Sequence, residues 1–97
     1  MRFKIRDKKL DALYFERKKA KKYTGLEEDF ITVIDDIRAV TDERGLYGLK
    51  SLRYEKLKGK MKGLRSLRLN AQFRLIVRPD QDEKGKYMEI LRIEDYH

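Results

Sequence analysis

The segment LRSLRLNAQFRLIVR (residues 64–78) decides the fold of this chain of 97 residues. Leu67 and Leu69 are spaced two residues apart, and Phe73, Leu75 and Val77 repeat that spacing. Such alternation is typical of strands that bury one face. Because only residues 70–71 separate the two runs, the pattern predicts an antiparallel hairpin closed by a two-residue turn.

The residues before this hairpin predict a strand and two helices. Residues 2–6 alternate between polar and apolar, as in a short half-buried strand. Apolar residues at helical spacing then predict a helix that begins at Lys8 and ends near Tyr23. Thr24 and Glu27 have the spacing of a capping box, which predicts the start of a second helix with a continuous apolar stripe.

Further strands are expected around the hairpin. Residues 53–57 are a weaker strand candidate, residues 79–85 form a polar connection with the only proline, and residues 87–93 are rich in residues that favour strands. The expected order is an N-terminal strand, two helices and an antiparallel meander of three or four strands. This order predicts one α+β domain over residues 1–97, with its helices packed on one face of the sheet.

Basic residues are concentrated in one part of the chain. The 25 basic and 17 acidic side chains give a net charge of +8, and residues 50–78 contain a single acid, Glu55. This excess favours a polyanionic partner. Because Arg74 and Arg78 fall on the same side of a predicted strand, phosphate binding is the leading interpretation. The ten basic residues of this stretch are Lys50, Arg53, Lys56, Lys58, Lys60, Lys62, Arg65, Arg68, Arg74 and Arg78.

Residue types that are scarce exclude several kinds of site. The chain has no cysteine, which excludes disulfides, thiolate catalysis and cysteine zinc sites. A single histidine cannot form a multi-histidine metal site, and no glycine pattern matches a nucleotide-binding fingerprint. We therefore expect neither a metal nor a cofactor. With no apolar run near the roughly 18 residues of a membrane span and no signal peptide, a cytoplasmic location without membrane contact is expected.

The last three residues, Asp95, Tyr96 and His97, follow a predicted strand directly. An imidazole, with its ordinary pKa of about 6.5, is a natural proton carrier, and a nearby carboxylate could hold it. RNA supplies its own nucleophile, the 2′-hydroxyl. An enzyme need only align this group, assist its deprotonation and neutralise the charge that develops at phosphorus. The tail and the basic residues together suit RNA cleavage.

Three pieces of the sequence resemble the HigB toxins of the RelE/ParE toxin superfamily. They are the Leu-Lys-Gly turn at residues 57–59, the hairpin at residues 66–75 and the closing residues 93–97; residues 3–10 are also similar. The resemblance implies a RelE-like fold and cleavage of messenger RNA in the ribosomal A site. It also implies a HigA-type helix-turn-helix antitoxin as partner, with a toxin–antitoxin heterotetramer on operator DNA.

The resemblance also assigns site residues. It implies that Lys58, Arg68 and Arg74 face RNA phosphates and that the closing three residues line the scissile site. The sequence departs from the family pattern at two positions. Phe73 replaces a typical tryptophan, and Glu55 stands where some relatives have a histidine. The carboxylate of Glu55 would act as a base or weaken RNA binding. The predicted catalytic residues are Arg74, Asp95, Tyr96 and His97, and the predicted RNA-binding residues are Glu55, Lys58, Lys60, Lys62, Arg68 and Arg78.

Two other functions stay open on the sequence alone. ParE toxins of the same superfamily bind DNA gyrase and are not nucleases, and a basic sheet does not separate the two activities. A non-catalytic RNA-binding module would need only the basic hairpin. The closing Asp-Tyr-His and the single histidine favour the nuclease.

Overall fold

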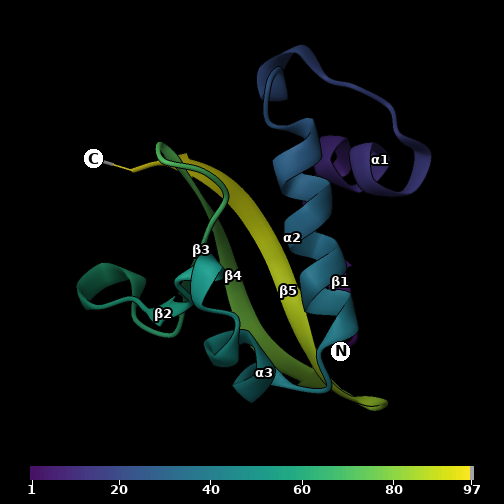
Figure 1. Cartoon of the computed structure of the whole chain (residues 1–97). Helices are drawn as coiled ribbons and strands as arrows, with labels where there is room; N and C mark the ends of the chain where they lie inside the picture. Colours follow the sequence, from purple (N-terminus) through teal and green to yellow (C-terminus); the bar gives the residue numbers. More distant parts are fainter. Residues whose placement is uncertain (97) are drawn as a thin grey trace.

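A five-stranded mixed sheet carries helices on one of its faces (Figure 1). The computed structural model describes residues 1–96, and the strand order is β1-β5-β4-β3-β2. β1 runs parallel to β5, and the other neighbours pair antiparallel. The predicted α+β fold is confirmed. Its elements are β1 (Phe3–Ile5), α1 (Lys8–Glu16), η1 (Lys21–Tyr23), α2 (Glu27–Ala39), α3 (Glu43–Gly48), η2 (Lys50–Leu52), β2 (Glu55–Lys56), η3 (Gly59–Met61), β3 (Arg65–Arg68), β4 (Phe73–Asp82) and β5 (Gly85–Asp95).

The core lies between the sheet and the helices. Leu67, Leu75 and Ile90, each from a different strand, are fully buried in one cluster with Leu10 of α1 and Phe30 of α2. Because successive side chains of a strand point to opposite faces, the residues that alternate with these leucines project from the other side of the sheet. We call that side, which the core cluster of the helices does not cover, the open face.

The first helix is shorter than predicted. α1 ends at Glu16, because Arg17 takes a left-handed backbone conformation with φ of 55°. The chain then turns back through residues 18–20 to η1. Residues 17–22 contain five basic residues and no large apolar one, so a longer helix would have had nothing to pack against the core.

The predicted capping box is wrong. The Thr24 hydroxyl donates to the Lys21 carbonyl, and the Glu27 carboxylate accepts from the Gly25 amide. Gly25 has φ of 86°, which favours glycine, and this turn places α2 without a side-chain cap. The apolar stripe of the second helix was predicted correctly, since packing rather than capping defines it.

The loop between β3 and β4 is longer than the predicted two-residue turn. The last pair of the ladder joins Arg68 to Arg74. Within the loop, Asn70 Oδ1 accepts from the amides of Gln72 and Phe73 at 2.8 Å each. An asparagine side chain commonly replaces a backbone turn in this way.

The predicted polar connection over residues 79–85 is also wrong, because β4 continues to Asp82 and β5 begins at Gly85. Pro79 is tolerated inside β4 for a physical reason. β3 pairs with β4 only as far as Val77, and the amide of Met88, opposite Pro79, donates to the carbonyl of Arg2, just before β1. The side of Pro79 where another residue would carry an N–H therefore lies on an unpaired edge of the sheet, so the proline removes no hydrogen bond between strands.

The short helix α3, which the sequence did not predict, is anchored through Glu43. Its carboxylate accepts from the Tyr54 hydroxyl at 2.6 Å and from Arg65 Nε at 3.1 Å. Burial, followed by the hydrogen bond to Glu43, raises the pKa of Tyr54 far above its ordinary value. Arg65, one of the ten clustered basic residues, thus serves the fold.

Asp7 offers a test of how α1 is held. Its carboxylate accepts from the amides of Lys9 and Leu10 and from the Tyr23 hydroxyl. Burial alone would raise the pKa of Asp7, but these three hydrogen bonds lower it overall. We expect Asp7→Ala to lower the free energy of unfolding by about 1–2 kcal/mol at neutral pH.

The sign of the pH dependence follows from the lowered pKa of Asp7. The stability that the carboxylate contributes is present above its unfolded pKa of about 3.9 and is lost as the pH falls through the folded pKa. Urea unfolding should therefore show the gap between the wild-type protein and Asp7→Ala narrowing in acid. An equal stability of the two proteins at neutral pH would contradict this role.

Candidate functional site

Arg74 of β4 projects from the open face, and one nitrogen of its guanidinium, Nη1, has no hydrogen-bond partner among the described residues. Its side chain is 14% exposed, and Nη1 is buried without a hydrogen-bond partner within residues 1–96. Glu55 Oε1 lies 4.0 Å from Nη1, and the Glu55 side chain is 56% exposed. An ion pair so long and so exposed contributes little. Because a buried donor without a partner costs free energy, Arg74 is suited to an anionic ligand.

Arg68 adds a second positive charge beside Arg74. The two residues stand directly opposite each other on β3 and β4. Like charges in this position destabilise a sheet. Arg68 Nε donates to the Asn70 carbonyl at 3.3 Å, and no ion pair of Arg68 is found among the described residues. The open face therefore carries two neighbouring arginines, with Glu94 opposite Arg74 on the other side, in β5.

Tyr96 covers Arg74 from the end of the chain. The guanidinium carbon lies 4.2 Å from the centre of the Tyr96 ring, within the range of a cation–π contact, and Tyr96 is 52% exposed. The Tyr96 amide donates to the Gln72 carbonyl at 2.7 Å, and Gln72 Nε2 donates to Asp95 Oδ2 at 3.1 Å. Gln72 thus holds both Asp95 and Tyr96 in place. The predicted catalytic His97 lies outside the described residues.

A hollow of about 120 Å³ opens beside Arg74. Its walls are partly apolar, and Ser66 Oγ, buried without a hydrogen-bond partner in the described part of the chain, lies in its lining. Four predicted site residues meet here although they are up to 41 positions apart in the sequence (Glu55 and Tyr96). The lining residues are Glu55, Leu57, Met61, Ser66, Arg74, Ile76, Glu94, Asp95 and Tyr96.

Three predicted RNA-binding lysines stand on the loop around η3. Lys58, Lys60 and Lys62 are exposed, and Met61 of the same loop lines the hollow. Gly59 bends the loop with φ of 67°. The lysines therefore lie near the hollow, without a described contact to the guanidinium of Arg74.

Arg78 is not brought into the hollow. It lies farther along β4 than Ile76, and its guanidinium pairs with Glu89, which also pairs with Arg6. Asp80 Oδ2 lies 3.9 Å from Arg78 Nη2. The structure therefore places Arg78 in an ion-pair cluster at another part of the open face.

Sequence reasoning missed six residues of this site. Five of them line the hollow, namely Leu57, Met61, Ser66, Ile76 and Glu94, and Gln72 fixes the chain end. The strand alternation carried a usable signal for Ser66, because a residue next to the core residue Leu67 must face the other way. Nothing in the spacing indicated the contact of Gln72 with the chain end.

No helix within residues 1–96 is long and apolar enough to cross a membrane. The same residues contain no group of three or more histidine, cysteine, aspartate or glutamate side chains placed to hold a metal ion.

The chain was also compared with known proteins. No protein-family model matches it, and no curated protein matches it. Among solved structures, it is similar to a YoeB/ParE toxin from Agrobacterium tumefaciens, with a TM-score of 0.57 and 18% identity over 100% of both chains. It is also similar to a chain of the YoeB-YefM complex from Staphylococcus aureus, with a TM-score of 0.53 and 22% identity over 100% of this chain and 97% of that one. The protein therefore has the fold of the YoeB/ParE-type toxins.

Proposed function

We propose that this protein is an endoribonuclease toxin of the HigB type, which cuts messenger RNA in the ribosomal A site. The observation that carries the proposal is Arg74, whose buried Nη1 has no hydrogen-bond partner within residues 1–96 and whose guanidinium stacks on the exposed Tyr96. An RNA phosphate supplies the missing acceptor, and a base can stack on the free side of the ring. The similarity in fold to solved toxins supports this assignment.

The reaction that suits this site needs no external nucleophile. The 2′-hydroxyl attacks the adjacent phosphorus while the bond from phosphorus to the 5′-oxygen breaks. The products are a 2′,3′-cyclic phosphate and a free 5′-hydroxyl. Arg74 neutralises the charge on the phosphoryl oxygens, which is the kind of electrostatic stabilisation with the largest effect on rate.

Protons must leave the 2′-hydroxyl and reach the departing 5′-oxygen. We assign this transfer to His97, with Asp95 orienting the imidazole. Lys58, Lys60, Lys62 and Arg68 bind the phosphate backbone on either side of the cut, whereas Arg78, which pairs with Glu89, is left out of this scheme. Glu55, whose Oε1 lies 4.0 Å from Arg74 Nη1, is the alternative acceptor of the 2′-hydroxyl proton in this scheme.

Primer extension on a messenger translated in vitro tests the proposal. Added protein should produce discrete cuts within codons when ribosomes are present. The competing function is inhibition of DNA gyrase, which the name of one similar structure, a YoeB/ParE toxin, brings into consideration. An intact messenger together with blocked supercoiling by gyrase would favour that alternative and contradict the nuclease.

An antitoxin partner follows from the proposed activity, because an unrestrained messenger-cutting enzyme stops growth. One similar structure is a chain of a YoeB-YefM complex. For this chain, with its charge of +8, we propose a HigA-type partner with an acidic contact segment. Expression of the chain alone in the cytoplasm should arrest growth, and co-expression of a small adjacent reading frame should restore it. Normal growth with abundant folded protein would argue against a toxin.

A further inference from the structure

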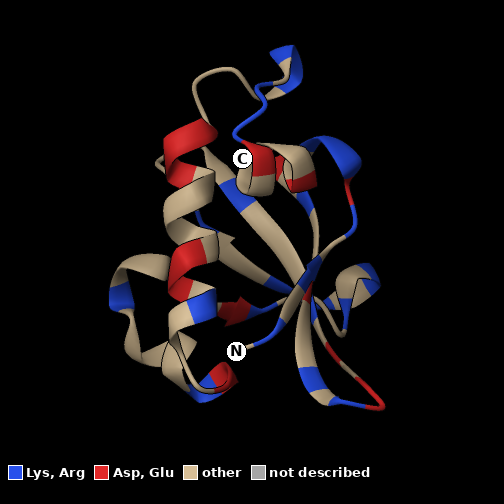
Figure 2. Ribbon diagram, turned by 90° about the vertical axis from the view of Figure 1, so that its right-hand side faces the viewer, with Lys and Arg blue, Asp and Glu red and all other residues tan. Residues whose placement is uncertain are grey.

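A second basic surface lies around α1, on the side of the sheet away from the open face. It is a hollow of about 370 Å³ with Ala12 and Ala20 in its lining, and we call it the lysine groove. Figure 2 shows the basic stretches at the start of α1, after its end and in η1 close together at the top of the view. Five lysines line the groove, all of them exposed: Lys8, Lys9, Lys18, Lys19 and Lys21.

No carboxylate neutralises these lysines in the described interactions. None of the five forms an ion pair within residues 1–96, and no acidic residue lines the groove. Asp7, Asp11 and Glu16 belong to the same segment. The carboxylate of Asp7 accepts hydrogen bonds from two backbone amides and the Tyr23 hydroxyl, and it forms no ion pair with the groove lysines in the described interactions. Asp11 and Glu16 do not line the groove, and the acidic residues beside Lys19 line a separate hollow. The groove therefore carries five lysines and no acidic residue in its own lining.

The position of these lysines does not favour folding. Lys8 and Lys9 occupy the first turn of α1, where the positive end of the helix dipole disfavours basic side chains. Arg17 adopts φ of 55°, an unfavourable conformation for a residue other than glycine, and so turns residues 18–21 back toward the start of α1. Both features oppose local stability and both assemble the groove, so the stability of the fold does not explain where these lysines lie.

The lining of the groove defines the class of that ligand. Apart from the lysines it contains only alanines, so it has no aromatic ring for stacking on a base and no amide for reading a base edge. It also has no large apolar side chain that could enter a membrane. Lysine ammonium groups act as point charges that suit phosphate oxygens. The chemistry is that of contact with a nucleic-acid backbone, independent of base sequence.

We propose that the lysine groove binds the phosphate backbone of a folded RNA other than the strand that is cut. The proposal rests on the proposed function, which makes RNA the nucleic acid that the protein meets. The sheet separates the groove from the hollow at Arg74, so one strand can occupy each site at the same time (Figure 1). Two simultaneous contacts raise the effective affinity for an RNA assembly that presents both strands.

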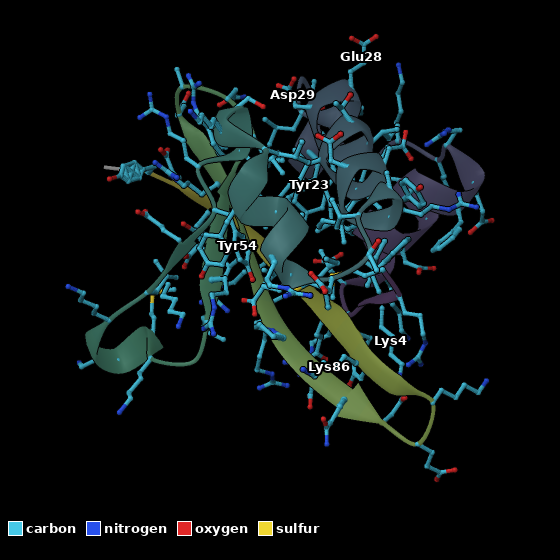
Figure 3. The ribbon with its side chains drawn as sticks, turned by 60° about the horizontal axis from the view of Figure 1, so that its bottom comes forward. Lys4, Tyr23, Glu28, Asp29, Tyr54 and Lys86 are labelled. Carbon is cyan, nitrogen blue, oxygen red and sulfur yellow. The ribbon has the colours of Figure 1, made fainter. Side chains whose placement is uncertain are left out.

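The test compares two pairs of substitutions that remove the same charge. One pair, Lys18→Gln with Lys19→Gln, lies in the groove. The control pair, Lys84→Gln with Lys86→Gln, lies on the projecting β4–β5 hairpin, where Figure 3 labels Lys86. The probe is an RNA hairpin with 2′-O-methyl riboses, which the protein cannot cut, and binding is followed by fluorescence anisotropy over a range of salt concentrations.

The groove pair should weaken binding to the hairpin about 25-fold at about 0.1 M salt and lower the salt slope by about 1.4, that is about 0.7 for each lost phosphate contact. The control pair should leave both values within about twofold of the wild-type protein. Equal weakening by the two pairs would mean that only net charge matters and would overturn the proposal, as would wild-type binding by the groove pair.

The same experiment separates this proposal from the proposed function. Hairpin binding is measured without cleavage, so it can depend on the groove even if the protein cuts no messenger. Conversely, the protein could cut a translated messenger while the Lys18 and Lys19 substitutions leave hairpin binding unchanged. That result would support the nuclease and contradict the proposal that the lysine groove binds RNA.

Discussion

Arg74→Ala should lower the rate of messenger cleavage by about 10²–10³, the usual effect of removing a donor that stabilises the charge of a transition state. Nη1 of the guanidinium has no described hydrogen-bond partner, and its ion pair with the exposed Glu55 is long, so the fold gains little from it. The free energy of unfolding should therefore change by less than about 1 kcal/mol. Single-turnover cleavage and urea unfolding measure the two quantities.

Two further variants make the role of Arg74 specific. Arg74→Lys keeps the charge but loses the planar group that stacks on Tyr96, so it should recover only part of the rate. Arg38→Ala, which removes an exposed arginine from α2, should cut at the wild-type rate. If Arg74→Ala instead unfolds at a much lower urea concentration and Arg74→Lys restores stability, Arg74 is structural.

Deletion of His97 should lower the cleavage rate by about 10²–10⁴, the typical contribution of general acid–base catalysis. His97→Gln should show the same loss, and the pH profile of either variant should lack the inflection near the ordinary imidazole pKa of about 6.5. Messenger binding should be nearly unchanged, because the positive residues around Arg74 remain.

Asp95→Asn and Tyr96→Phe provide graded comparisons. Each should lower the rate less than loss of His97, since Asp95 orients the imidazole in our scheme and the Phe variant keeps the ring that covers Arg74. A protein lacking His97 that cuts at the wild-type rate would move proton transfer to Glu55 or Lys58.

The core-facing pattern of the strands was predictable, because burial on one face leaves a strict period of two. Leu67 and Leu75 were assigned to strands on that pattern and are fully buried partners in β3 and β4. Turns and helix ends were less predictable. The end of α1 depends on Arg17 in a left-handed conformation, and the strand through Pro79 depends on where β3 stops.

The charged members of the candidate site were predictable by residue type, while their assembly was not. The contact between Arg74 and Tyr96 depends on the register of β4 against β5. That register shifts by one residue between Ile76 and Val77, so that Leu91 is an extra residue in β5. No local propensity at Leu91 indicates the bulge, and a shift of one residue reverses which face each later side chain occupies.

A messenger with a single 2′-deoxynucleotide tests most directly the central claim that this protein cleaves RNA through the 2′-hydroxyl. The deoxy sugar is placed on the 5′ side of one mapped cut, and translation reactions with and without the protein are analysed by primer extension. We predict that the all-ribose messenger is cut at that position and that the deoxy messenger stays intact there while its other sites are cut. Equal cutting of both messengers at that position, or no cutting of either, would contradict the account.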